Sequence, residues 1–166
     1  MILGMSIPTF TLIHVLISLV GIGAGVVVLF GMLASKLLSG WTGSFLATTV
    51  LTSVTGYFFP VNQILPSHIV GAISLVVLAL AIFALYVQRL AGPWRSVYVV
   101  SAIMALYLNV FVAVVQAFLK IRFLHALAPQ QSDPPFIIAQ LVVLAAFVAL
   151  GVMAFKSFRP QGRFGI

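Results

Sequence analysis

Long runs of apolar residues, separated by short polar stretches, divide the chain into five segments. The segments cover residues 8–35, 41–59, 66–90, 94–124 and 135–158. Because about 20 helical residues cross the roughly 30 Å hydrocarbon layer of a bilayer, each segment is long enough to form a transmembrane helix. The pattern therefore predicts an all-α fold, an integral membrane bundle of five transmembrane helices in which residues 1–166 form a single domain.

The second segment is the least apolar of the five. Hydroxyl-bearing residues interrupt it at Thr48, Thr49, Thr52, Ser53 and Thr55. Ser and Thr hydroxyls bond to carbonyls one turn back, so we expect this segment to stay helical in lipid. The alternative is a bundle of four spans in which the second segment is re-entrant.

Composition agrees with a membrane location and narrows the possible chemistry. Hydrophobic residues make up 63% of the chain and charged residues 5%, and the mean hydropathy is +1.30. A soluble domain carries about a quarter charged residues, so that class is excluded. There is no Cys and a single acid, Asp133, which leaves no cysteine ligands and no paired carboxylates for acid–base catalysis. These totals favour a protein that is not an enzyme.

The positive charge predicts an orientation. The eight Lys and Arg residues, which dominate a net charge of +7, stand between apolar runs and form no basic face for nucleic acid, so the expected partner is the lipid bilayer. With five spans, one side of the membrane receives six of them: Lys36, Arg89, Arg95, Lys156, Arg159 and Arg163. The other side receives Lys120 and Arg122. Because cytoplasmic loops are enriched in Lys and Arg, we expect a periplasmic N-terminus and a cytoplasmic C-terminus.

The same topology gathers the three histidines on the non-cytoplasmic side. His14 and His68 lie near the outer ends of two helices, and His125 lies just beyond the end of another. Two imidazoles from neighbouring helices are the minimum for a b-type haem, so His14 and His68 are candidate ligands of haem b. A metal ion, with His125 or water completing the site, is the related alternative.

Two helical stripes are further candidates for a site. His14 shares one stripe with Ser18, Gly21 and Gly25, which forms either a groove for a flat cofactor or a small-residue packing face. Asn109 and Gln116 lie on a second stripe, on the fourth segment. These amides either hydrogen-bond between helices or, together with Gln140, line an outward-facing polar cavity for a quinone headgroup or a small solute.

Four stretches carry a resemblance to a known family. They are FLATTVLTSVTGYFFP (45–60), LPSHIVG (65–71), ALYLNVFVAVVQAFLK (105–120) and LAPQQSDPPF (127–136). Together the chain resembles a family of small uncharacterised bacterial inner-membrane proteins. The resemblance implies a location in the bacterial inner membrane and assigns no activity.

Three functions follow from these patterns. The first is a non-enzymatic accessory or structural subunit, which packs in a homo-oligomer or a larger membrane complex through the Gly and amide stripes. The second is an electron-transfer protein that binds haem b or a metal through His14 and His68. The third is a module that binds a quinone or small solute in the polar cavity.

Overall fold

The computed structural model describes residues 2–60 and 66–160. That part of the chain is almost entirely helical and contains no strand, which confirms the all-α class. The elements are α1 (Ile7–Leu33), α2 (Ser39–Gly56), α3 (Pro66–Ile82), the π-helical turn η1 (Phe83–Val87), α4 (Trp94–Lys120), α5 (Arg122–Leu127) and α6 (Pro134–Ser157).

Four helices of the described chain are long and apolar enough to cross a membrane. They are α1, α3 with its continuation through η1, α4 and α6. The chain is therefore compatible with an integral membrane protein. The 18-residue helix α2 is not among the four, because its Ser, Thr and Gly residues lower its hydropathy.

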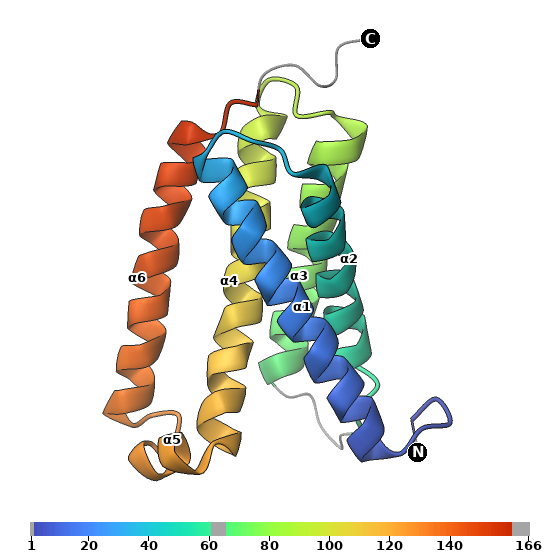
Figure 1. The fold of residues 1–166 in the computed structure, drawn as a ribbon. Helices are drawn as coiled ribbons and strands as arrows, with labels where there is room; N and C mark the ends of the chain where they lie inside the picture. Colours follow the sequence, from blue (N-terminus) through green and yellow to red (C-terminus); the bar gives the residue numbers. More distant parts are fainter. Residues whose placement is uncertain (1, 61–65, 161–166) are drawn as a thin grey trace.

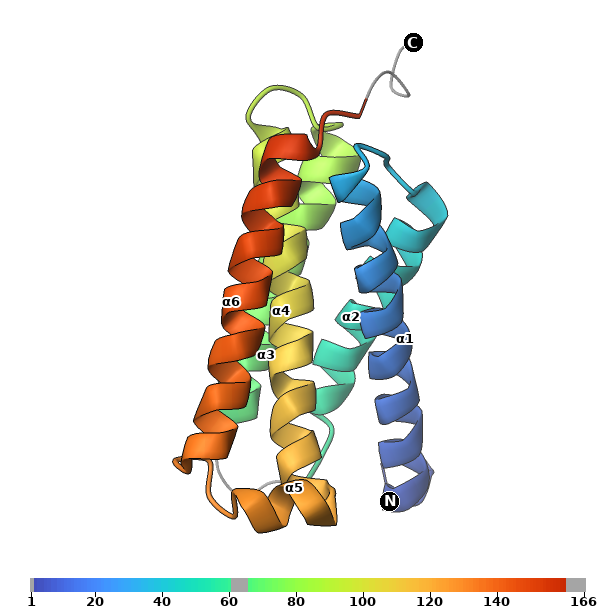
Figure 2. The same ribbon diagram turned by 60° about the vertical axis from the view of Figure 1, so that its left-hand side comes forward.

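Helices α1, α2, α3, α4 and α6 lie side by side, and each of these five runs in the direction opposite to the one before it (Figure 1, Figure 2). Helices α1 to α4 form a ring, in which α1 contacts α2, α2 contacts α3, α3 contacts α4 and α4 contacts α1. Helix α6 packs outside this ring, on α4 and α1. We call the end of the bundle that carries α5 and the start of α1 the α5 end, and the other the opposite end.

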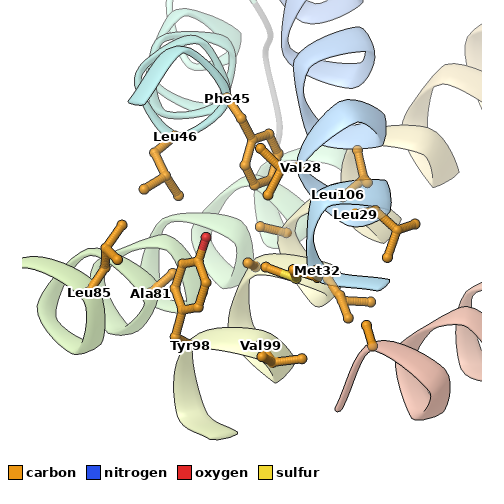
Figure 3. Close-up of a cluster of buried hydrophobic side chains, with 14 of the residues drawn as sticks. Val28, Leu29, Met32, Phe45, Leu46, Ala81, Leu85, Tyr98, Val99 and Leu106 are labelled. Atoms are coloured by element: carbon orange, nitrogen blue, oxygen red, sulfur yellow. The ribbon is translucent and has the colours of Figure 1, made fainter. Parts of the chain in front are cut away.

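The half of the bundle nearer the opposite end is closely packed. Side chains from all four ring helices and η1 meet there, including Met32, Phe45, Leu85 and Tyr98 (Figure 3). Gly25 allows this close approach, since a Cβ atom at that position would come within 2.5 Å of the Leu106 side chain.

The fourth helix is shorter than the sequence predicts, and the predicted end at residue 124 is wrong. Helix α4 ends at Lys120, Ile121 adopts an extended conformation with φ −87° and ψ 115°, and the chain continues as α5. The break folds the chain back, so that Ala128 packs with Phe118 and Phe136 in a small second core. Burial of these three side chains favours the break over a continuous helix.

Arg95 fastens the end of α6 to α4. Its guanidinium donates hydrogen bonds to the carbonyls of Phe155, at 3.2 Å, and Phe158. The guanidinium carbon also lies 5.7 Å from the centre of the Phe155 ring, within the range of a cation–π contact. Carbonyls in the last turn of a helix lack hydrogen-bond donors within the helix, so Arg95 provides the donors that α6 itself lacks.

Candidate functional site

A cavity of about 540 Å³ lies among α1, α2, α3 and α4, in the half of the bundle nearer the α5 end. Its volume is in the range of small-molecule binding sites. Apolar side chains form much of the wall, and polar side chains enter it from each of the four helices. Among the described residues that line the cavity, Lys120 is the one charged side chain and none is acidic.

The cavity ends where three helices converge on Gly21. A Cβ atom at Gly21 would lie 3.1 Å from Thr48 Oγ1 and 3.3 Å from both Thr49 Oγ1 and Asn109 Nδ2. Ile22 on α1 and Leu108 on α4, each one residue deeper than Gly21 and Asn109, are the innermost lining residues of their helices. The absence of a side chain at Gly21 therefore lets α2 and α4 close the inner end of the cavity against α1.

His14 is held in the cavity wall by α2. Its Nδ1 atom lies 2.8 Å from Thr55 Oγ1, and its ring meets Phe59 edge-on at 5.3 Å between centres. The Thr55 hydroxyl donates its single proton to the Leu51 carbonyl, at 2.6 Å. The arrangement that satisfies both contacts is the one in which Thr55 accepts from His14 and the Nδ1 atom of a neutral His14 carries the proton.

His68 lines the same cavity from the first turn of α3. The Tyr57 hydroxyl donates to the His68 carbonyl at 2.7 Å, and the two rings lie 5.5 Å apart. The structure thus brings His14 and His68 to one cavity. His125 lies on α5 and does not line it. Within residues 2–60 and 66–160, no three His, Asp or Glu side chains are grouped so that they could hold a metal ion.

The predicted amides separate in space. Asn109 and Gln116 both line the cavity, and Asn109 Nδ2 is buried without a hydrogen-bond partner in the described chain. Gln140 is not among the lining residues. Its Nε2 atom donates to the Phe111 carbonyl at 3.2 Å, on the side of α4 that faces α6. Gln140 therefore links α6 to α4.

Two hydroxyl-bearing residues of α2, Thr52 and Ser53, also line the cavity, and neither was predicted from the sequence as a site residue. Thr48 and Thr55 donate to carbonyls four residues back, as expected. For Thr49 and Thr52 this expectation is wrong, because their hydroxyls are buried with no partner among the described residues. The spacing of three residues places Thr49 and Thr52 on one inward face of α2, and this spacing can be read from the sequence.

The stripes proposed for packing against other proteins are used within the chain. Gly21 and Gly25 are buried in α1 against α2 and α4. Asn109 and Gln116 face the cavity. Assembly into an oligomer or larger complex stays a prediction, and it would need surfaces other than these.

Comparison with known proteins adds no assignment. No protein-family model, no curated protein and no solved structure matches the chain. The resemblance noted from the sequence therefore stays a prediction, and any function has to be argued from the site.

Proposed function

We propose that the chain is an integral membrane protein with five crossings that binds a small amphipathic molecule in the cavity among α1 to α4. The observation that carries this proposal is a cavity of about 540 Å³ that combines apolar walls with polar groups from four helices. Binding sites for small molecules have this composition, with a few polar groups that orient the ligand against apolar walls. Binding alone needs no paired acids, in keeping with the single Asp of the chain.

The path of α2 supports five crossings over four. Helix α2 runs beside α1 in the opposite direction, and α3 begins at the α5 end (Figure 1). A re-entrant segment would instead return to the end where it started. This path puts five described basic residues at the opposite end, Lys36, Arg89, Arg95, Lys156 and Arg159, against Lys120 and Arg122 at the α5 end. We infer that the α5 end faces away from the cytoplasm.

The ligand would enter from the lipid, between the diverging halves of α1 and α4. These helices are in contact near Gly25 and separate towards the α5 end (Figure 2). Both line the cavity over the separated part. Val15 and Leu19 line it and are also exposed on the surface, at 36% and 56%. An opening flanked by exposed apolar side chains favours a molecule that dissolves in the bilayer.

A variant whose larger side chain fills the cavity tests the proposal. Ala113 lines the cavity, whereas Ala145 is an exposed residue on α6. The probe is 4-octylanisole, an amphiphile whose one polar atom is an ether oxygen, and native mass spectrometry counts the bound molecules. We expect one bound molecule in the wild type and in Ala145→Phe, and none in Ala113→Phe. Absence of binding to the wild type, or equal binding to both variants, would contradict the proposal.

Haem binding is the second candidate, and one observation favours it. His14 and His68 line one cavity, and His14 is oriented through Nδ1 by Thr55. Histidines that ligate a metal are commonly fixed in this way through the nitrogen that does not bind it. A reduced-minus-oxidised absorption spectrum of protein purified from membranes tests this candidate. A Soret band that disappears in His14→Ala supports it, and a spectrum without a chromophore removes it.

A further inference from the structure

The hydrogen bonds of His14 restrict what the cavity can bind. When Nδ1 of the neutral imidazole donates to Thr55, the arrangement that satisfies both contacts of the Thr55 hydroxyl, the lone pair of the ring lies on Nε2. Nε2 makes no hydrogen bond to any described residue, although His14 lines the cavity. The wall therefore presents an unused acceptor, which is complementary to a ligand that brings a proton donor.

Unpaired polar groups continue inward from His14 at intervals of one helical turn. Thr52 lies three residues from Thr55, which is about 4.5 Å along the helix axis. Its buried hydroxyl lines the cavity and has no partner in the described chain. Three residues further in, Thr49 Oγ1 and Asn109 Nδ2, both without a partner in the described chain, lie beside Gly21. A ligand head with more than one oxygen could therefore hydrogen-bond at successive levels.

The side chains that line the cavity do not match a ligand with a charged head group. No acidic side chain is found among the described lining residues, so nothing there neutralises a cationic head. Lys120 is exposed at the last residue of α4, where water screens its charge. Deeper in, the polar groups are hydroxyl, amide and imidazole groups, with no carboxylate, Lys or Arg among the described lining residues. This combination fits a neutral head.

We propose that the cavity selects a lipid-soluble phenol or quinol, whose hydroxyl group donates to His14 Nε2 and whose ring lies against the apolar wall. Thr55 acts as the positioning residue, because it fixes the proton on Nδ1. A second oxygen on the ring would reach the level of Thr52. The inference rests on the proposed function, since it concerns the ligand of the same cavity.

A matched pair of probes isolates the hydrogen bond to His14. The pair is 4-octylphenol and 4-octylanisole, which share the ring and chain and differ in whether the oxygen carries a proton. We expect the wild type to bind the phenol about fivefold more tightly than the anisole, the value of one ordinary net hydrogen bond. Native mass spectrometry gives both dissociation constants in the same detergent.

Variants identify the residues responsible for the preference. His14→Phe keeps a flat ring without the acceptor and should bind the two probes equally. Thr55→Val removes the group that fixes the proton and should also lose the preference, whereas Thr55→Ser should retain it. Thr48→Val removes a comparable α2 hydroxyl that does not contact His14 and should also retain it. An equal loss of both probes in Thr55→Val would indicate a structural role and overturn the assignment.

The outcomes separate this inference from the function on which it rests. If the wild type binds both probes equally, or if His14→Phe keeps the preference, the phenol assignment is wrong and the binding function stands. If decanoate binds more tightly than the phenol and loses its binding in Lys120→Gln, the ligand is an anion. If neither probe nor decanoate binds, both the inference and the proposed function fail.

Discussion

Gly25 on α1 lies against the ring of Phe45 on α2. A Cβ atom at Gly25 would come within 2.9 Å of two atoms of that ring. Two residues earlier, at Gly23, the same atom would have nothing within 4 Å. Neighbouring glycines of one helix therefore have opposite roles, because Gly25 faces the core of the ring and Gly23 faces outward.

Substitution by alanine at Gly25 and at Gly23 should change the free energy of unfolding in opposite directions. We expect Gly25→Ala to lower the free energy of unfolding by about 1–3 kcal/mol, because the added methyl group overpacks the contact with Phe45. Gly23→Ala should raise it by about 0.5–1 kcal/mol, since alanine loses less backbone entropy in a helix. Thermal unfolding in one detergent measures both. An unchanged melting temperature in Gly25→Ala would contradict the close contact.

Arg95 should contribute to stability through the end of α6. Arg95→Ala removes the donors to the carbonyls of Phe155 and Phe158, and we expect a loss of about 1–2 kcal/mol. Lys156→Ala, an exposed cation on the same turn of α6, should change the stability by less than about 0.5 kcal/mol. Hydrogen exchange should also quicken in the last turn of α6 in the first variant alone. Equal effects of the two variants would show that charge, rather than the hydrogen bonds, matters there.

The absence of Cys makes the crossing of α2 directly testable. Gly40 lies at the start of α2 and has open space around it, and Phe58 lies just beyond its end and is 47% exposed. In sealed membranes, a maleimide that cannot cross the bilayer should label Gly40→Cys and Phe58→Cys from opposite sides. Ala91→Cys should match the first and Ser132→Cys the second. Labelling of both α2 positions from one side would support the re-entrant alternative.

Two amides that look alike in the sequence should behave differently. Asn109→Leu removes an unpaired buried donor, so we expect weaker binding of 4-octylanisole with stability unchanged or raised. Gln140→Leu removes the hydrogen bond to the Phe111 carbonyl and should cost about 1 kcal/mol of stability without affecting binding. Calorimetric melting and native mass spectrometry distinguish the two. A binding defect in Gln140→Leu would contradict its placement outside the cavity.

The apolar runs predict most of the helix bounds, because length and hydropathy are local properties. The predicted span 135–158 and the observed α6 (Pro134–Ser157) differ by one residue at each end. The break at Ile121 could not be predicted in this way. The residues around it are all compatible with a helix, and the break depends on the contact of Phe118 with Ala128 and Phe136.

Some features of the candidate site could likewise be predicted from the sequence, and others could not. His14, His68, Asn109 and Gln116 come to one cavity because alternating helix directions set their depth, which sequence positions reveal. Gln140 has a comparable depth but lies elsewhere, since the order of helices around a bundle is not a local property. The unpaired hydroxyl of Thr52 could not be predicted from the sequence, for another reason. Whether a Thr bonds back to its own helix depends on its side-chain rotamer and its neighbours.

Helix α6 contributes no residue to the lining of the cavity, whose described walls come from α1 to α4 and from Tyr57 and Phe59 just after α2. In the order of synthesis, every one of these walls precedes α6. Chains fold from the N-terminus as they emerge, so the cavity can be assembled while α6 is still in the ribosome. The binding part of the protein would then be ready before its outer helix arrives to cover α4.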